Sequence, residues 1–387
     1  MSSTANQRSG DPWTSIDEQR MEEAIALARY DLTRTSPNPR VGCVIYDREG
    51  RLISSGVTRP PGGPHAEVQA LRAAVDSGRS VEGATAYVTL EPCSHTGRSG
   101  PCVAALISAG IARVCVGAVD PNPLVSGRGI AWLMDKGVSV SVGVCGEACA
   151  RLHDPFFKWI LTGRPWVSLK GAMTLDGCLA TARGHSKWIT GEQARTHVHQ
   201  LRAQVDAVLV GGETARRDRP ALTVRLCEGT HPRPAALSRR LSIPNDSPFL
   251  GEDALLIHGP DAPQDRKDQL QNLGATLIEV PYLEDQTGQT SQLDLNIALD
   301  ALGSEEITHL CVEGGGHLHG SLLDAGLVDD LHLYIAPRLI GRGKPLFNFA
   351  SVDTIMDGWR LIDTHAESLG DDIYMYGRFK RPDPEEG

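Results

Sequence analysis

The stretch EPCSHTGRSGPC (Glu91–Cys102), together with HAE at His65–Glu67, decides how the first half of the chain folds and what it can bind. A β-rich run at Ala84–Leu90 precedes it, so we expect a strand that ends just before Cys93. Apolar residues at helical spacing follow both the histidine and the second cysteine, so we expect a helix to begin at each. One imidazole and two thiols therefore lie at the ends of a strand and of two helices.

These three side chains form a good ligand set for zinc. Imidazole and thiolate ligands suit this metal, and three protein ligands leave the fourth position open for water. Cys102 has a further advantage, because the positive end of its helix helps to deprotonate a thiol. Zinc lowers the pKa of bound water to about 7, and Glu67 can move a proton from that water to a departing nitrogen.

The order H-x-E…P-C…C is typical of zinc-dependent deaminases. The interval between Cys93 and Cys102 is longer than the two residues of the general signature. Three other interpretations stay open. The site could be a structural zinc site, which normally has four protein ligands, or a zinc-stabilised binding module without catalysis. The cysteines could also simply fill the core, as we expect for Cys43 and Cys115.

Helix and strand patterns alternate outward from this segment, from Ile16 to about Ala150. Such alternation predicts an open α/β sheet with helices on its faces. The expected strands are Val41–Tyr46, Leu52–Val57, Ala84–Leu90, Arg113–Val119 and Val138–Val144. The expected helices are Met21–Ala28, Glu67–Ala74, Val103–Ala109 and Gly129–Lys136.

A second α/β series follows, and no internal repeat relates it to the first. Its expected strands are Trp166–Lys170, Ala207–Val210, Ala254–Ile257, Ala275–Val280, His309–Val312 and Leu331–Ile335, and its expected helices include Glu192–Ala203 and Leu318–Asp324. At about 150 residues per domain, the chain has room for two or three domains. We predict two different α/β domains, divided as a disordered tail at 1–15, a first domain at 16–150, a linker at 151–165, a second domain at 166–380 and a tail at 381–387.

Composition excludes several classes of protein. Hydrophobic residues make up 41% and charged residues 22% of the 387 residues, which is typical of a globular protein with real cores. No stretch approaches the roughly 20 apolar residues of a membrane helix, so we expect no membrane partner. A net charge of −10 and an aromatic content of 5% argue against nucleic-acid partners, including those of an RNA or DNA base deaminase.

The cysteines and the N-terminus indicate a compartment. Met1–Asp11 lacks the apolar run of a secretory signal. Nine cysteines is an odd number, and a chain of this length needs no disulfide staples. We therefore expect a cytoplasmic protein with reduced thiols.

The sequence resembles the bifunctional riboflavin-biosynthesis deaminase/reductases from about Ile16 to Lys380. In the first half the likeness lies in the long cysteine interval, in SPNPRVG at Ser36–Gly42 and in DPNP at Asp120–Pro123. In the second half the matching segments are Lys170, Asp176–Gly177, Ser186–Gly191, Leu201–Ala203, Pro220–Arg225, Glu313–Gly315 and Gly326–Asp329. That family is often oligomeric, so we expect a homo-oligomer with a phosphorylated pyrimidine as its small-molecule substrate.

For the first half the resemblance implies a cytidine-deaminase-like three-layer α/β/α domain. It would deaminate a diaminopyrimidinone that carries a ribosylamino 5′-phosphate, with Glu67 as the catalytic proton shuttle. The ligands of one Zn²⁺ would be His65, Cys93 and Cys102. The polar contacts to the substrate would be Asn38, His95 and Asp120, although Asn and Asp beside proline are also common turn formers.

For the second half the resemblance implies a dihydrofolate-reductase-like α/β domain that uses NADPH to reduce the ribosyl group to ribityl. The residues implied to contact the substrate are Ser186, Arg202, Leu222, Arg225 and Glu313. The two arginines suit its 5′-phosphate, because guanidinium groups bind phosphate bidentately. The residues implied to line the cofactor are Lys170, Ala172, Asp176, Trp188, Thr214, Asp218, Gly315, Gly316, His317, Leu318, His319, Gly320 and Ser321. Trp188 has a second interpretation as a core aromatic residue.

The residues themselves say less about the second half. EGGG at Glu313–Gly316 lies between an expected strand and an expected helix, where backbone N–H groups can cradle a phosphate. It is not G-x-G-x-x-G, so a Rossmann fold is not indicated.

Four positions depart from the family pattern around the cofactor, namely Cys178, Arg219, Arg239 and His317. Each lost hydrogen bond to NADPH would cost around 1 kcal/mol. A neighbouring cation could compensate by pairing with the cofactor's 2′-phosphate, and the candidates are Arg216, Arg217 and Arg239. Alternatively, the basic run Arg216–Arg219 is simply a solvated patch on the surface. The alternative function is then a deaminase whose reductase domain is degenerate or redirected within a specialised pathway.

Overall fold

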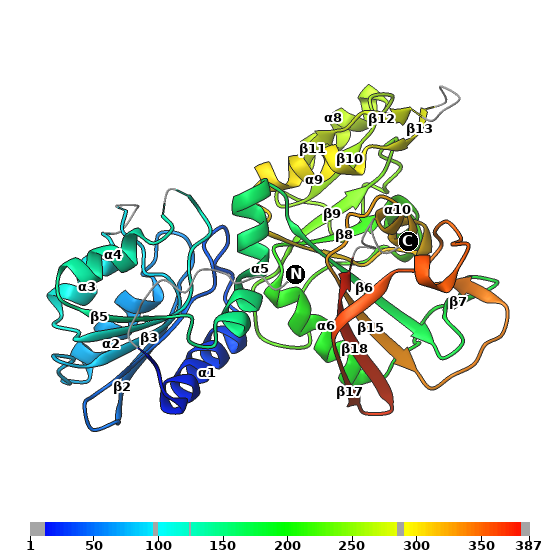
Figure 1. The fold of residues 1–387 in the computed structure, drawn as a ribbon. Coiled ribbons are helices and arrows are strands. Elements are labelled where there is room, and N and C mark those ends of the chain that lie inside the picture. Colours follow the sequence, from blue (N-terminus) through cyan, green and yellow to red (C-terminus); the bar gives the residue numbers. More distant parts are fainter. Residues whose placement is uncertain (1–11, 96–99, 124, 285–289, 381–387) are drawn as a thin grey trace. The chain divides into compact units, whose positions relative to one another are not determined.

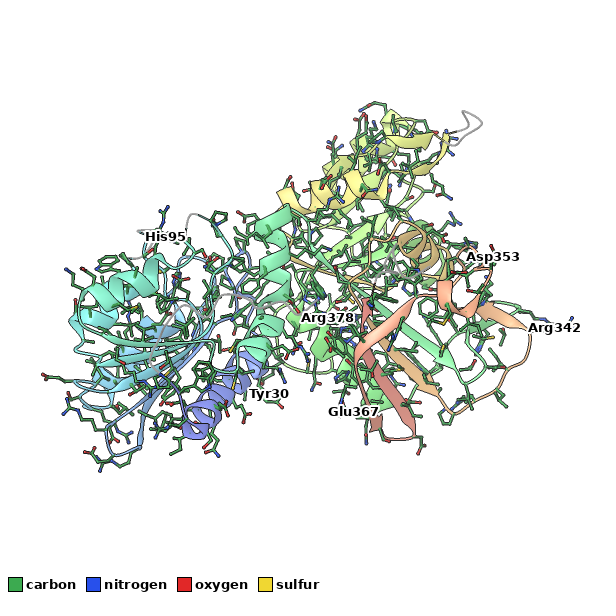
Figure 2. The ribbon with its side chains drawn as sticks, viewed as in Figure 1. Tyr30, His95, Arg342, Asp353, Glu367 and Arg378 are labelled. Atoms are coloured by element: carbon green, nitrogen blue, oxygen red, sulfur yellow. The ribbon has the colours of Figure 1, made fainter. Side chains whose placement is uncertain are left out.

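The computed structural model describes residues 12–95, 100–123, 125–284 and 290–380, and it divides into two compact units, 1–163 and 164–387 (Figure 1). Each unit has its own sheet and its own hydrophobic core. The two-domain α/β architecture is therefore confirmed, and Figure 2 adds the side chains that fill both units. The predicted tails fall outside the described residues except for 12–15, and Ser15 already begins a helix.

The first unit is built on a five-stranded sheet in the order β2-β1-β3-β4-β5. Strands β3, β4 and β5 are parallel, whereas β1 pairs antiparallel with β2 and β3. Helix α1 packs with α5, and α2, α3 and α4 are successive neighbours (Figure 1). The bounds are α1 Ser15–Tyr30, β1 Gly42–Tyr46, β2 Leu52–Val57, α2 Ala66–Asp76, β3 Thr85–Leu90, α3 Cys102–Ser108, β4 Arg113–Ala118, α4 Arg128–Asp135, β5 Ser139–Val142 and α5 Gly146–Thr162. Every strand and helix predicted up to Val144 is confirmed.

A buried carboxylate anchors α1 to this sheet. Asp17 is 3% exposed, and it accepts hydrogen bonds from the Arg113 guanidinium at 2.9 and 3.2 Å and from the Tyr87 hydroxyl at 2.8 Å. It also forms a capping box with Thr14 at the start of the helix. Burial alone would raise the pKa of Asp17, but the Thr14 N–H, Arg113 and Tyr87 lower it to about 2.

We expect Asp17→Asn to lower the free energy of unfolding of this unit by about 2 kcal/mol at pH 7, the equivalent of a pKa shift from 3.8 to about 2. Because the folded-state pKa is the lower one, the carboxylate stabilises above about pH 4 and loses its contribution as the pH falls toward 2. Urea unfolding at pH 7 and pH 3 should show that the difference in free energy of unfolding between wild type and variant is smaller at pH 3. An equal difference in free energy of unfolding at both pH values would contradict a lowered pKa for Asp17 in the folded protein.

The linker predicted at 151–165 is wrong, because helix α5 runs through it to Thr162. The helix contains Pro155 and continues past it to Thr162, and its C-cap residue is Gly163, whose φ of 73° is left-handed. His153 is buried, and Phe156 and Phe157 pack against the core of the first unit. Apolar burial outweighs the backbone hydrogen bond that proline cannot donate.

The second unit carries a nine-stranded sheet in the order β11-β10-β9-β8-β14-β6-β15-β18-β17. The strands from β11 to β15 are parallel, and β18 and β17 add antiparallel at one edge. The predicted elements correspond to β6 Trp166–Thr174, α6 Glu192–Gln204, β8 Ala207–Gly211, β10 Leu255–His258, β11 Thr276–Glu279, β14 His309–Val312, α10 Gly316–Asp324 and β15 Asp330–Ala336. None of the helices in the described part of the chain is long and apolar enough to cross a membrane.

Several elements of this unit were not predicted. They are β7 Cys178–Thr181, α7 Gly212–Asp218, β9 Arg233–Leu237, α8 Gln264–Asn272, β12 Tyr282–Glu284, β13 Thr290–Leu293, α9 Leu295–Ser304, β16 Gly343–Pro345, β17 Arg360–Leu369 and β18 Asp372–Lys380, with a short 3₁₀ turn at Ile355–Asp357. Strand β17 is exposed along nearly its whole length, so it lacks the alternation that marks a half-buried strand. Strand β9 contains Pro234, and proline cannot donate a hydrogen bond to a neighbouring strand, so the sequence alone does not predict a strand here.

Candidate active sites

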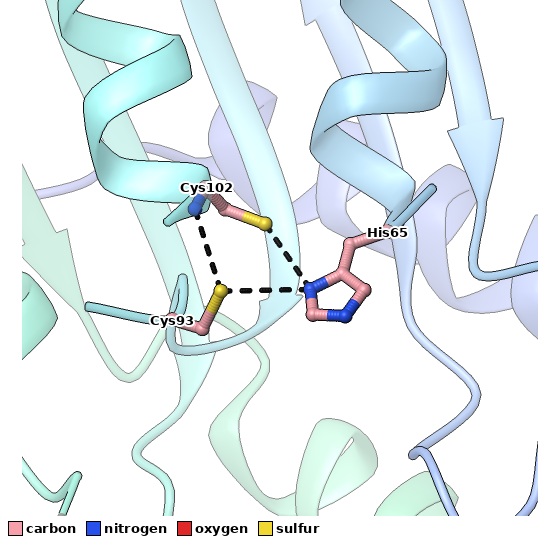
Figure 3. A group of neighbouring side chains, drawn as sticks. All are labelled: His65, Cys93 and Cys102. Atoms are coloured by element: carbon pink, nitrogen blue, oxygen red, sulfur yellow. Dashed lines mark hydrogen bonds between the residues drawn. The ribbon is translucent and has the colours of Figure 1, made fainter. Parts of the chain in front are cut away.

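Three element ends meet in the first unit. His65 is the N-cap residue of α2, Cys93 follows the end of β3, and Cys102 is the first residue of α3. His65 Nδ1 lies 3.2 Å from Cys102 Sγ and 3.5 Å from Cys93 Sγ, and the Cys102 N–H donates to Cys93 Sγ at 3.3 Å (Figure 3). The structure therefore brings the three predicted zinc ligands together.

The geometry of this triad fits a tetrahedral zinc ion. Zinc bonds to nitrogen at about 2.0–2.1 Å and to sulfur at about 2.3 Å, which separates a nitrogen and a sulfur ligand by about 3.6 Å. The observed separations are close to that value, and all three ligand atoms lie within 4.8 Å of one another. Within the described ranges, this is the only such group of three His, Cys, Asp or Glu side chains. Three ligands rather than four indicate a site that leaves one position open.

The electrostatics around the triad favour a thiolate beside a protonatable carboxyl group. Hydrogen bonds from Cys102 and His65 lower the pKa of Cys93 to about 4. Glu67, two residues after the histidine, is 3% exposed, and its side chain interacts with Cys102. Burial and the nearby Cys93 raise the pKa of Glu67 to about 7. A carboxyl group with that pKa can both accept and donate a proton near neutral pH.

The three predicted substrate contacts of this unit differ in placement. Asp120 follows β4, and burial raises the pKa of its carboxyl group, with a smaller contribution in the same direction from Cys93 of the triad. His95 is exposed (Figure 2). Asn38 lies in a turn, where its N–H donates to the Thr35 carbonyl and its carbonyl accepts from the Thr35 hydroxyl. The turn-forming interpretation of Asn38 thus has a structural basis.

In the second unit, two cations converge on Glu313, which follows β14. Its carboxylate accepts two hydrogen bonds from the Arg202 guanidinium at 2.6 and 2.9 Å, and Lys170 Nζ lies 3.8 Å away. The three side chains are only 11–16% exposed. Burial alone would raise the pKa of Glu313, but Arg202 and Lys170 lower it to about 2. The cluster keeps one excess positive charge, which suits an anionic ligand.

Helix α6 also fixes the neighbouring segment 222–225. Arg202 donates to the Thr223 carbonyl at 3.0 Å, and the Arg225 N–H donates to His199 Nδ1 at 2.9 Å. Leu222 is 2% exposed and packs in the core, so its side chain does not face a substrate. The prediction of a contact at Leu222 can hold only for its backbone.

A cavity of about 860 Å³ opens beside two strand-to-helix turns, Gly211–Gly212 and Gly315–Gly316. Its volume is in the range of small-molecule sites, about 300–1,000 Å³. A Cβ added at Gly315 would have Thr214 Oγ1 at 3.9 Å as its one near neighbour, so the turn is open enough for a ligand. The predicted residues that line the cavity are Ser186, Thr214, Asp218, Gly315, Gly316, His317, Leu318 and Ser321.

The cavity also contains residues that sequence reasoning missed, among them Gly211, Gly212, Ser242, Lys344 and Asn348. Gly211 and Gly212 could have been predicted as lining residues, because they follow the expected strand Ala207–Val210 as the EGGG stretch follows His309–Val312. The others come from segments without a recognisable pattern.

Several predicted cofactor residues do not line this cavity. His319 is 0% exposed, and its Nε2 lies 3.3 Å from both the Gly314 N–H and the Val312 carbonyl, so it stabilises the turn from inside. A Cβ at Gly320 would collide with the Asn348 carbonyl, so this glycine serves close packing. Asp176 accepts from the backbone N–H groups of 340 and 341, which occupies one of its oxygens. His319 and Gly320 thus have packing roles, and a cofactor contact at any of these three positions stays a prediction.

Three further predicted cofactor residues lie elsewhere. Lys170 belongs to the Glu313 cluster, and Ala172 packs beside the small core around Tyr334. Trp188 is 67% exposed beneath the Arg195 guanidinium, 4.8 Å from its ring centroid. The interpretation of Trp188 as a core aromatic residue is therefore wrong.

The arginines that depart from the family pattern or could compensate for the departures are not equivalent. Arg219 forms an ion pair with Asp246, and Arg239 pairs with Asp261 at 3.2 Å and with the Tyr282 hydroxyl at 3.0 Å. Arg217 pairs with Glu213 at 3.0 Å. Within the described ranges, Arg216 has no ion-pair partner, although it lines the cavity.

Two protein-family models match the chain, one in each of its two units. Residues 14–118 match the cytidine and deoxycytidylate deaminase zinc-binding region, and residues 165–375 match the RibD C-terminal domain. The riboflavin biosynthesis protein RibD of Aquifex aeolicus is 39% identical over 95% of this chain and 99% of its own. The RibD protein of Escherichia coli is 37% identical over 93% of this chain and 98% of its own.

Solved structures extend the likeness to the whole fold. RibD of Acinetobacter baumannii superposes with a TM-score of 0.82 and 36% identity, covering 95% of this chain and 99% of that one. A Thermotoga maritima structure with the same coverage has a TM-score of 0.81 and 32% identity. Its title describes a diaminohydroxyphosphoribosylaminopyrimidine deaminase/5-amino-6-(5-phosphoribosylamino)uracil reductase.

Proposed function

The chain belongs to the RibD family of riboflavin-biosynthesis enzymes, and from that premise we propose which of its residues carry out each reaction. It is a zinc-dependent deaminase joined to an NADPH-dependent reductase. We propose that the deaminase acts on 2,5-diamino-6-ribosylamino-4(3H)-pyrimidinone 5′-phosphate and that the reductase converts the resulting ribosyl group to ribityl. The observation that carries this proposal is the convergence of His65, Cys93 and Cys102 beside the buried Glu67.

In the deaminase, His65, Cys93 and Cys102 would hold the metal. Bound zinc supplies Lewis acidity that makes a water molecule nucleophilic at neutral pH. Glu67 takes the proton from that water and delivers it to the amino group that leaves as ammonia. Asp120 and His95 would orient the pyrimidine or its ribose from the loops after β4 and β3.

In the reductase, NADPH supplies the hydride, and the residues present fit the cofactor. The open turn at Gly315 and the start of α10 would hold its phosphates through backbone N–H groups. Arg202 and Arg225 would bind the 5′-phosphate of the substrate. Lys170 Nζ is too far from Glu313 for a direct hydrogen bond, so its N–H groups stay available to a substrate oxygen or nitrogen.

Mass spectrometry of the purified protein with the diaminopyrimidinone substrate tests both steps. Without NADPH we expect a gain of about one mass unit, because hydrolytic deamination replaces an NH unit by oxygen. With NADPH we expect a further gain of about two mass units. A first shift without the second would show that the reductase is disabled or redirected, and the absence of both would overturn the proposed substrate.

Arg216 provides a sharper test of the cofactor assignment. Because it lines the cavity and has no ion-pair partner in the described part of the chain, we expect Arg216→Ala to weaken NADPH binding about 10–100-fold, the loss typical of charge-assisted hydrogen bonds to a phosphate. Binding of NADH, which lacks the 2′-phosphate, should change little. Fluorescence titration with both cofactors measures this, and Arg217→Ala, whose guanidinium is already paired, should have a smaller effect. Equal weakening of NADH and NADPH would contradict a role at the 2′-phosphate.

We further propose that the protein works in the cytoplasm as a homo-oligomer, with no nucleic-acid or membrane partner. All nine cysteines are free, which supports a reducing compartment. The net charge of −10 argues against a phosphate-backbone partner. Light scattering coupled to size-exclusion chromatography measures the number of chains.

A further inference from the structure

Glu91, at the end of β3, is a buried carboxylate that accepts four backbone hydrogen bonds. Glu91 is only 5% exposed. Oε1 accepts from the N–H groups of Gly129 at 2.9 Å and Ile130 at 3.4 Å. Oε2 accepts from the N–H groups of Gly127 at 2.9 Å and Asp120 at 3.3 Å. No water is needed to satisfy this carboxylate.

Two of these bonds replace a missing helix cap. Helix α4 begins after Gly127, which has no side chain and adopts a left-handed φ of 74°. The free N–H groups of the first turn are usually satisfied by a Ser, Thr, Asp or Asn at the N-cap position. Here Glu91 supplies that carboxylate from another element, and the positive end of the helix favours its negative charge.

The other two bonds fix both ends of the loop between β4 and α4. Asp120 and Gly127 lie near the two ends of the segment between β4 and α4, and Glu91 accepts from the backbone N–H group of each. The packing is tight, since a Cβ added at Gly129 would come within 2.1 Å of the Pro92 carbonyl. Pro92 directly precedes the predicted zinc ligand Cys93. The loop is therefore tied to the same chain segment that carries the metal ligand.

We propose that Glu91 is a positioning residue of the deaminase, which holds Asp120 at a fixed place beside the His65–Cys93–Cys102 triad. Asp120 is 9% exposed, and its own Oδ1 accepts from the Asn122 N–H at 2.9 Å, which sets the direction of its side chain. The four hydrogen bonds to the Glu91 carboxylate all come from backbone N–H groups, so it acts through Asp120. The inference rests on the proposed deaminase function, because it assigns Asp120 to substrate binding.

Glu91→Gln tests the proposal with little change of shape. An amide nitrogen is a donor, so one side of the new side chain would face two backbone N–H groups instead of accepting from them. We expect the KM for the diaminopyrimidinone to rise about tenfold or more with kcat little changed, since binding in the ground and transition states is lost together. Zinc content should stay at the wild-type level. Amide exchange in segment 119–133, followed by mass spectrometry, should become faster.

Gly129→Ala provides a second, independent variant, because it leaves Glu91 intact and pushes the same helix end away. It should raise the KM in the same direction, and the two effects should be less than additive in the double variant. Glu147→Gln, an exposed carboxylate on α5, is the matched control. The reductase rate of each sample shows that the second unit is intact.

The outcomes separate the possibilities. Faster amide exchange with an unchanged KM would show that Glu91 has a purely structural role, and this would overturn the proposal. Unchanged exchange together with an unchanged KM would overturn it as well. Failure of wild type and Glu147→Gln to release ammonia would instead refute the proposed function itself.

Discussion

Glu67→Gln should retain zinc and lose deamination, with a rate lower by about 10²–10⁴-fold, the usual contribution of general acid–base catalysis. The physical reason is that the amide cannot accept a proton from water or pass one to the leaving nitrogen. Burial raises the pKa of the native carboxyl group to about 7, which matches a group that must do both at neutral pH. The measurements are ammonia release and the zinc content of the purified variant.

Two controls make this result specific. Glu147→Gln removes an exposed carboxylate from the same unit and should deaminate at the wild-type rate. The Glu67→Gln protein should also still reduce substrate that has been deaminated beforehand, because the reductase is a separate unit. Near-normal ammonia release by Glu67→Gln would exclude the proton-shuttle role of Glu67.

The metal site could be predicted because each of its ligands is recognisable from the residues next to it in the sequence. His65, Cys93 and Cys102 each stand at the boundary of an element that the surrounding apolar pattern predicts. Their meeting follows from the topology, since the N-termini of α2 and α3 and the end of β3 lie at one edge of the sheet. Glu67 needed no long-range information, because it lies two residues from the histidine on the first turn of a helix.

The parts that were missed depend on contacts between distant segments. Nothing near Glu91 in the sequence shows that it caps a helix beginning at Arg128. His319 looked available for a cofactor, yet it is fully buried because its helix turns that face inward. Helix α5 was missed because Pro155 argues locally against a helix, whereas Phe156 and Phe157 stabilise one by packing on a core built from earlier residues.

Both units place their chemistry by the same rule. In open α/β sheets, ligands bind where parallel strands end and helices begin. In the first unit this edge holds Cys93 after β3 and Asp120 after β4. In the second unit it holds Gly211 at the end of β8 and Glu313 after β14. The residues that we propose for ligand binding thus lie at the equivalent edge of the sheet in two unlike domains.

Glu313→Ala is the variant of the second unit with the largest expected effect. It would leave the Arg202 guanidinium buried without its carboxylate, and breaking a buried pair in this way costs about 3–5 kcal/mol. Lys170 would lose its counter-charge as well. We therefore expect the reductase unit to unfold at clearly lower urea concentration and the reductase reaction to be lost. The deaminase, whose core is separate, should keep its rate.

A matched pair of variants separates the ion pair from a general effect of charge removal. Glu279→Gln removes a carboxylate that pairs with Lys267 at the surface, where its side chain is 53% exposed, and such pairs contribute little. Its unfolding midpoint should equal that of wild type. Glu313→Asp keeps the charge but shortens the side chain, so it should recover part of the stability while reduction stays slow, since the carboxylate no longer holds both guanidinium donors. If Glu313→Ala were as stable as Glu279→Gln, the Arg202–Glu313 pair would not be the element that holds this site together.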